Sequence, residues 1–224
     1  MKFKSALNRI LGRDSFMEPQ LCYAQEGEDL LLNRFLEGQE QGFYVDVGAH
    51  HPVRFSNTYM FYKRGWRGIN IDAMPGSMKK FNQVRPRDIN LECGVASDSA
   101  TLKFYRFNEP ALNTFSQVEA DLKNKPPYAL VDTVDVPVEP LDVLLTRHVP
   151  DGQQIDFLSV DVEGKDEEVL RSNDWQRYRP RFVLAETLRT DILGLNSCPI
   201  VKFLAEVGYK PIAKAYNTSF FERT

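Results

Sequence analysis

The chain has 224 residues, of which 28 are basic and 31 acidic, and its formal net charge is −3. This length suits one α/β domain with a full core, and hydrophobic and charged contents of 42% and 26% exclude a disordered or fibrous chain. Because the charge is nearly balanced, nothing attracts the whole chain to phosphate backbones, and nucleic acid is not an expected partner.

The first residues predict a helical extension, which we place at residues 1–40. Basic and apolar side chains are mixed at its start (Lys2, Phe3, Lys4, Leu7, Arg9, Ile10, Leu11 and Arg13). A packed or frayed terminal helix is the favoured interpretation, and peripheral contact with a membrane surface is the alternative. No apolar run approaches the roughly 18 residues that span a bilayer, and no cleavage site follows an apolar segment, so we expect a cytoplasmic protein without transmembrane segments.

Residues 41–224 are predicted to form one domain in which strands and helices alternate. Short apolar, β-branched runs that stop at glycine or an acid indicate buried strands, and apolar residues at helical spacing indicate helices. In the first half the pattern predicts a helix at 30–36, a strand at 42–48, a helix at 57–64, a strand at 67–72, a helix at 75–85 and a strand at 88–93.

The second half continues the alternation and ends differently. Two runs, 101–107 and 131–138, are predicted as strands, but the pattern does not fix their place in the sheet. After them we expect helices at 141–147, 165–172 and 200–207, strands at 155–161 and 181–186, and a closing hairpin formed by 209–215 and 219–222. The expected fold is therefore α/β and Rossmann-like, with a mostly parallel, twisted sheet and a C-terminal antiparallel hairpin.

Polar residues and glycines lie where the predicted parallel strands end. Gly48 follows the first strand, Asp72 ends the second and Asp161 ends a later one. Ligands of open α/β sheets bind at this edge, where a glycine lets the backbone approach the ligand and an acid can accept hydrogen bonds from ribose hydroxyls. The combination indicates a nucleoside cofactor.

The loop after the first strand helps to choose between cofactors. Dinucleotide sites use three glycines to seat a pyrophosphate, whereas residues 48–53 (Gly-Ala-His-His-Pro-Val) contain one. S-adenosylmethionine has no pyrophosphate, so methyl transfer is favoured over hydride transfer. A nicotinamide-dependent oxidoreductase and an inactive binding module are the alternatives.

Several segments together resemble the FkbM-type methyltransferases, an S-adenosylmethionine-dependent family that acts mainly on hydroxyl groups of sugars and natural products. The resemblance covers most of the chain. It is carried by Tyr23–Leu30 (YAQEGEDL), Val45–Pro52 (VDVGAHHP), Phe55–Thr58 (FSNT), Gly65–Gly68 (GWRG), Asp161–Gly164 (DVEG) and Arg179–Pro180 before the strand that ends in Glu186.

This resemblance implies a set of cofactor contacts. Asp46, Gly48 and Ala49 would face the methionine part, Asp72 and Ala73 the ribose, and Gly94, Val95 and Ala96 the adenine. Asn57 and Thr58 would close the pocket, Gln25 and Glu28 would fold over the cofactor, and Asp161 would contact it.

The acceptor and the general base are less determined. The resemblance implies a small molecule or glycan as acceptor, such as a sugar of a polysaccharide, a lipopolysaccharide or a glycosylated metabolite, while a protein or another metabolite stays an alternative.

Methyl transfer needs an aligned oxygen and a base, and the candidates for the base are His50, Asp161, Glu163 and Glu186, with His50 favoured for its pKa. The three carboxylates would also suit Mg²⁺, although a site without metal is favoured. Homo-oligomer formation is left open.

Overall fold

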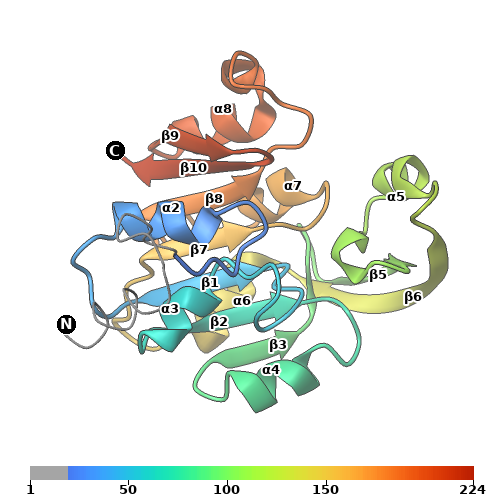
Figure 1. Ribbon diagram of the computed structural model, residues 1–224, viewed down its shortest axis with the longest axis horizontal. Helices are drawn as coiled ribbons and strands as arrows, with labels where there is room; N and C mark the ends of the chain where they lie inside the picture. The colour runs from blue at the N-terminus through green and yellow to red at the C-terminus, as the bar shows by residue number, and fades with distance from the viewer. Residues whose placement is uncertain (1–19) are drawn as a thin grey trace, which may run out of the picture.

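A computed structural model describes residues 20–224 as a mixed α/β fold around a seven-stranded sheet (Figure 1). The strand order is β3-β2-β1-β7-β8-β10-β9. Five strands run parallel: β1 (Phe43–Val47), β2 (Arg67–Asp72), β3 (Ile89–Glu92), β7 (Phe157–Val160) and β8 (Phe182–Glu186). The last two, β9 (Tyr209–Ala215) and β10 (Thr218–Arg223), form an antiparallel hairpin in which β10 lies between β8 and β9.

Helices cover both faces of this sheet because its strands are apolar on both sides. In β1, Phe43, Val45 and Val47 belong to one core cluster, and Tyr44 belongs to the other. The first cluster includes residues of α6 (Leu141–His148), α7 (Asp166–Arg171) and α8 (Pro199–Glu206). The second includes residues of α2 (Glu28–Phe35) and α3 (Tyr59–Lys63).

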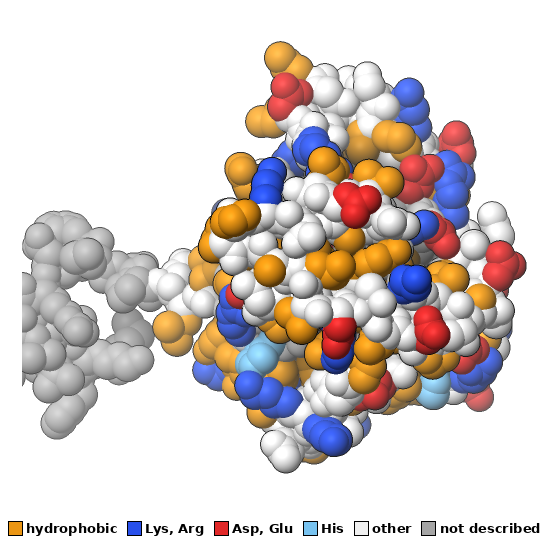
Figure 2. Space-filling view, turned by 90° about the vertical axis from the view of Figure 1, so that its right-hand side faces the viewer, with side chains coloured by type: hydrophobic (Ala, Val, Ile, Leu, Met, Phe, Trp, Pro, Cys, Tyr) orange, Lys and Arg blue, Asp and Glu red, His pale blue; other side chains and the backbone are white. Residues whose placement is uncertain are grey.

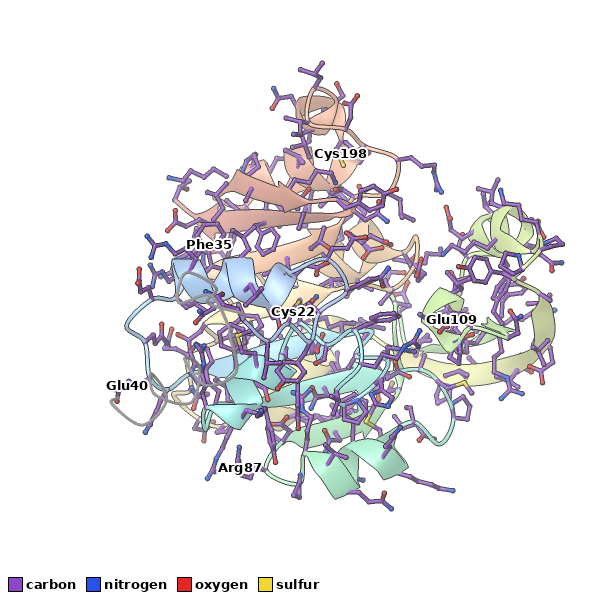
Figure 3. All side chains as sticks on the ribbon, in the orientation of Figure 1. Cys22, Phe35, Glu40, Arg87, Glu109 and Cys198 are labelled. Carbon is purple, nitrogen blue, oxygen red and sulfur yellow. The ribbon has the colours of Figure 1, made fainter. Side chains whose placement is uncertain are left out.

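Two further contacts join helices to the sheet and to the loop after β1. Phe35 of α2, labelled in Figure 3, stacks on Phe182 of β8 with a centroid distance of 5.8 Å. On the other side, α4 (Met78–Val84) packs through Met78 and Phe81 against Ala49. The loop after β1 is therefore fixed to α4 at Ala49.

A second, three-stranded sheet projects from the main one between β3 and α6. It consists of β4 (Gly94–Val95), β6 (Leu130–Glu139) and β5 (Ala100–Phe107), in that order. The segment between β5 and β6 carries the short helix η1 (Pro110–Leu112) and α5 (Gln117–Lys123). We call residues 94–139 the excursion; Figure 1 shows it in green and yellow beside the carboxyl ends of the parallel strands.

The predicted fold class is confirmed, including the parallel sheet and the terminal hairpin. Two details differ from the prediction. Residues 94–95, expected as a break, form the short strand β4, and the two strands of uncertain placement pair with each other outside the main sheet. The helix expected near the N-terminus at residues 1–13 lies outside the described residues. Within residues 20–224, no helix is long and apolar enough to cross a membrane.

The carboxyl ends of the parallel strands face the excursion. The chain order reverses at β1, because β2 lies on one side of it and β7 on the other. Ligands of open α/β sheets bind at such a reversal. Figure 2 shows the molecule from this side, where acidic and basic side chains are interspersed with hydrophobic ones and neither charge dominates.

Candidate active site

Two adjoining cavities open at the carboxyl edge of the sheet. The first lies between the ends of β1, β2 and β4 and the excursion, and we call it the cofactor cavity after the contacts expected from the sequence. The second lies between the loop after β1, residues 25–28, the excursion and the end of β8, and we call it the acceptor cavity after the expected acceptor. They share five lining residues, namely Gly48, His50, Ala111, Asp161 and Glu163. A ligand in one cavity would therefore lie next to a ligand in the other.

Gly48 is required by the close approach of two strand ends. Its φ is +81°, in the left-handed region that favours glycine, and a Cβ there would lie 1.7 Å from the carbonyl oxygen of Asp161. Any side chain at this position would push β1 and β7 apart. Gly48 thus sets how closely the loop after β1 can approach Asp161, at the junction of the cavities.

The two histidines of this loop have different surroundings. The backbone N–H of His50 donates to Asp72 Oδ2 at 2.8 Å, which ties the loop to the end of β2. Burial and the nearby charge of Arg54 lower the pKa of His50 to about 4, so its imidazole is neutral at neutral pH. His51 instead accepts backbone N–H groups of Val53 and Arg54 through Nδ1 and shapes the turn.

Asp72 lies in the cofactor cavity with a nearly buried carboxylate. Each oxygen accepts one backbone N–H, from His50 and from Met74, both at 2.8 Å. Burial nevertheless raises its pKa above the usual value. Each carboxylate oxygen can accept a second hydrogen bond, so Asp72 retains capacity for hydroxyl groups of a ligand.

The opposite side of the cofactor cavity is apolar. Val95 and the rings of Phe104 and Phe115, whose centroids are 4.8 Å apart, line it. A Cβ at Gly94 would lie 2.6 Å from the ring of Phe115, so this glycine lets the ring lie against the strand. The cavity therefore combines one carboxylate with flat apolar walls.

Three carboxylates gather where the cavities meet. Asp161 and Glu163 follow β7, Glu186 ends β8, and one oxygen from each lies within 4.8 Å of the others. Lys123 of α5 pairs with Glu163. Burial and the neighbouring carboxylates raise the pKa of Asp161 well above its usual value and that of Glu186 to about 11. Burial also raises the pKa of Glu163, although Lys123 opposes that effect.

The acceptor cavity has further polar groups on its walls. Gln25 is exposed, and Glu28 is buried and accepts a hydrogen bond from Thr218 Oγ1 at 3.2 Å. Asn57 donates through Nδ2 to Ser159 Oγ at 3.1 Å, which fixes its amide at the cavity wall. These groups come from segments far apart in the sequence.

The structure brings most of the sequence-predicted site residues to the cavities. The cofactor cavity is lined by Gly48, His50, Asp72, Ala73, Gly94, Val95, Asp161 and Glu163, and the acceptor cavity by Gln25, Glu28, Gly48, His50, Asn57, Asp161, Glu163 and Glu186. Four predicted residues line neither: Asp46, Ala49, Thr58 and Ala96.

Asp46 and Thr58 form a buried network behind the site. Thr58 donates to Asp46 Oδ2 at 2.7 Å, and Arg85, itself fully buried, donates to Thr58 Oγ1 at 3.0 Å and to the Tyr44 hydroxyl at 2.8 Å. Burial raises the pKa of Asp46 to about 6, and Arg85 counteracts this. The network holds β1 against the segment that leads into α3.

Sequence reasoning missed the site residues that the excursion contributes. Lys123 and Glu109 come from a polar segment without periodicity, so only the pairing of β5 with β6 places them at the cavity. Glu109 lies on the side of the excursion that faces the main sheet (Figure 3). It binds Arg54 through two hydrogen bonds of 3.0 Å. Arg54 could have been found, because it lies two residues after the His-His-Pro segment at residues 50–52.

Comparison with known proteins yields a family match and several structural neighbours, one of which is described below. Residues 46–211 match the methyltransferase FkbM domain. A TehB-like SAM-dependent methyltransferase from Corynebacterium glutamicum is similar to the chain with a TM-score of 0.43 and 11% sequence identity, over 100% of this chain and 96% of that chain. No curated protein matches the sequence.

Proposed function

Because its FkbM domain match covers well over half of the sequence, the chain belongs to the FkbM methyltransferase family, and from this premise we propose that it transfers a methyl group from S-adenosylmethionine to a sugar hydroxyl. The sugar would belong to a polysaccharide, a lipopolysaccharide or a glycosylated metabolite. The observation that carries the proposal is the pair of cavities, which meet at Gly48, His50 and Asp161.

The residues of the cofactor cavity fit S-adenosylmethionine. Phe104 and Phe115 offer flat apolar surfaces for an adenine ring, and Asp72 offers acceptor capacity for two ribose hydroxyls. Asp161 and Glu163 place carboxyl groups where the bound cofactor would carry positive charge, which would favour their ionised forms. When bound, the cofactor supplies an electrophilic methyl group on a positively charged sulfur.

The same cavity does not suit a dinucleotide. A pyrophosphate binds at a helix N-terminus directly after the glycine loop, where several N–H groups and the helix dipole face it. Here the next helix, α3, begins at Tyr59, ten residues after Ala49 (59 − 49). Carboxylates, rather than free N–H groups, lie around Gly48. These features favour methyl transfer over hydride transfer.

We propose that His50 is the general base. Its ring lines both cavities and is neutral at neutral pH, so it can accept the proton that leaves the acceptor oxygen. When the acceptor oxygen is methylated, this proton would pass to the imidazole of His50 and from there to solvent. A weak base suffices, because the oxygen becomes strongly acidic once it carries the methyl group. The roles of Asp161, Glu163 and Glu186 are to orient the acceptor.

The acceptor cavity has the chemistry of a site for a polyhydroxy compound. Its carboxylates accept hydrogen bonds from hydroxyl groups, and amides such as Asn57 and Gln25 can donate them. Phe55 and Tyr128, 37% and 42% exposed, provide apolar ring faces at its rim. This mixture supports a sugar acceptor.

A binding measurement tests the cofactor assignment. Asp72→Ala should weaken S-adenosylhomocysteine binding more than tenfold, or about 1.4 kcal/mol, because the ribose loses its acceptor. Asp151→Ala, at an exposed turn, is the matched control and should bind as the parent does. Isothermal titration reports both. Unchanged affinity in a folded Asp72 variant would refute the ribose assignment, and tight binding of NAD in place of S-adenosylhomocysteine would refute the function.

The acceptor class needs a separate experiment. Methyl-labelled S-adenosylmethionine is incubated with nucleotide sugars, oligosaccharides, peptides and amines, and the linkage in any labelled product is determined by NMR. Label on a sugar oxygen is the expected result. Label on nitrogen, or on peptides alone, would contradict the sugar proposal and leave the methyltransferase assignment intact.

A further inference from the structure

The carboxylates of Asp161, Glu163 and Glu186 are arranged as ligands of a hard divalent cation. They come from the ends of two neighbouring parallel strands, and one oxygen of each lies within 4.8 Å of the others. We propose that these three side chains bind a divalent cation of the magnesium and calcium class at the junction of the two cavities. This site adds to the proposed function, because the role of the cation in holding the acceptor rests on that function.

The spacing of the three oxygens agrees with the size of such a coordination sphere. Opposite ligands lie about 4.1 Å apart across Mg²⁺ and about 4.8 Å apart across Ca²⁺, given metal–oxygen distances of about 2.05 and 2.4 Å. The upper limit of 4.8 Å between the carboxylate oxygens falls at the larger of these values. Only one pair of the three oxygens can lie opposite each other and adjacent ligands lie closer, so this limit is compatible with Ca²⁺, whereas Mg²⁺ or Mn²⁺ would require the carboxylates to approach each other.

Glu186 gives a second and independent indication of a missing partner. Its side chain is buried, with 7% of the residue exposed, and Oε2 has no hydrogen-bond partner within residues 20–224. A buried polar atom without a partner is costly, so a cation or a donor from a ligand is expected beside it. No sequence pattern could show this atom, and it favours the cation over the metal-free site that the sequence suggested.

The charges around the cluster point to a cation and not to an anionic ligand. Lys123 neutralises one of the three carboxylates through Oε2 of Glu163. When they are ionised as ligands of a cation, Asp161 and Glu186 carry two formal negative charges, and the second oxygen of Glu163 can bind the same cation while Lys123 stays in place. A divalent ion would balance the two remaining charges.

The place of the cluster indicates what the cation would do. Asp161 and Glu163 line both cavities, and Glu186 lines the acceptor cavity. Three protein ligands leave about three positions of an octahedral sphere for other oxygens. Two neighbouring hydroxyls of an acceptor could take two of them, which would hold the reacting oxygen beside the cofactor cavity.

Direct metal binding to the free protein tests the site without any acceptor. Mn²⁺, followed by electron paramagnetic resonance, and Ca²⁺, followed by isothermal titration, are added to protein stripped with EDTA. We expect one strong site in the parent, and at least tenfold weaker binding in Asp161→Asn and Glu186→Gln. Glu206→Gln, an exposed residue of α8, is the control and should bind as the parent does. Absence of Mn²⁺ and Ca²⁺ binding, or equal binding by Glu186→Gln, would overturn the proposal.

Lys123→Gln should change metal affinity in the opposite direction to the carboxylate variants. Removal of the competing ammonium group frees both oxygens of Glu163, so Mn²⁺ should bind more tightly than to the parent. Melting temperatures measured with EDTA and with Ca²⁺ show whether a variant changes metal binding or only folds less well. Glu186→Gln should be at least as stable as the parent in EDTA and should gain less from Ca²⁺. Equal gains would contradict the site.

A failure of the cation site can be told apart from a failure of the proposed function. S-adenosylhomocysteine binding is measured in EDTA for every variant. If the cofactor binds and the metals do not, the cation site is wrong and the methyltransferase assignment stands. If the metals bind and the cofactor does not, the proposed function fails.

Discussion

His50 has a left-handed backbone conformation, with a φ of 52°, which is uncommon for residues other than glycine, although asparagine, aspartate and histidine adopt it more often than the rest. This conformation turns its ring toward the line where both cavities meet, while its N–H holds Asp72. Strained residues that a fold maintains often lie at functional sites. The geometry at His50 thus agrees with the role of general base.

His50→Asn isolates the proton transfer from the backbone geometry. Asparagine tolerates the positive φ, but its amide cannot accept a proton. We expect kcat for the methylated acceptor to fall by about 10²-fold to 10⁴-fold, the usual range for loss of a general base. S-adenosylhomocysteine affinity, measured by titration, should stay within about threefold of the parent. A variant that keeps its kcat would show that another group, with Asp161 the next candidate, removes the proton.

The contact between Arg54 and Glu109 joins two elements across the mouth of the acceptor cavity. Arg54 belongs to the loop after β1, Glu109 precedes η1, and the side chains are 45% and 31% exposed. A pair this exposed contributes at most about 1 kcal/mol to folding. Its main effect should be to position the excursion over the acceptor.

Arg54→Gln is expected to raise the KM for the acceptor by about tenfold while unfolding free energy changes by less than about 1 kcal/mol. Steady-state kinetics and urea unfolding give the two numbers. Arg106→Gln is the matched control, because Arg106 pairs with Asp132 within the excursion and neither residue lines a cavity. If both variants raised KM equally, the contact at the cavity mouth would have no special role.

At the level of elements, the parallel strands and the terminal hairpin could be predicted because their signals are local. Apolar runs end at Gly48, Asp72 and Asp161, and the parallel-sheet rule places these residues at one edge. The excursion could not be placed in this way. Alternation in residues 101–107 and 131–138 predicts strands, but which strands pair depends on contacts distant in sequence.

The orientation of side chains could not be predicted from the sequence either. Asp46 and Gly48 lie two residues apart in one motif, yet Asp46 turns into the Thr58 and Arg85 network while Gly48 lines both cavities. Residues i and i+2 of a strand share a face, but β1 ends at Val47 and the chain turns at Gly48, where φ is +81°, so the motif alone does not tell which of its residues meets the ligand. The buried oxygen of Glu186 that has no hydrogen-bond partner could likewise be recognised only from the three-dimensional packing.

For the whole molecule, the buried carboxylates determine how stability depends on pH. The pKa of Asp166 is raised to about 7 and that of Glu186 to about 11, chiefly by burial. The folded protein therefore holds protons that the unfolded chain releases above about pH 4.5. The stability that these groups contribute is present at low pH and is lost as the pH rises through their folded pKa values. His50, whose pKa is lowered to about 4, acts oppositely, but only below about pH 6.5.

Between pH 6.5 and 8.5 we therefore expect the free energy of unfolding to fall as the pH rises, by on the order of 1 kcal/mol per pH unit for each extra bound proton. Urea unfolding in EDTA at constant ionic strength measures it. Glu186→Gln removes one of these protons and should show a smaller slope. A parent protein whose stability rises over this range, or a variant with an unchanged slope, would be incompatible with protonated buried carboxylates.

The position of β10 has a consequence for synthesis of the protein. This strand, Thr218–Arg223, lies inside the sheet between β8 and β9, and Thr218 also holds Glu28 of α2. On a ribosome, residues 20–217 would emerge with β8 unpaired along one side, and the sheet could close only after residues 218–223 have left the exit tunnel. The sheet next to Glu186 is therefore completed last, and a nascent chain would need protection there from pairing with other chains.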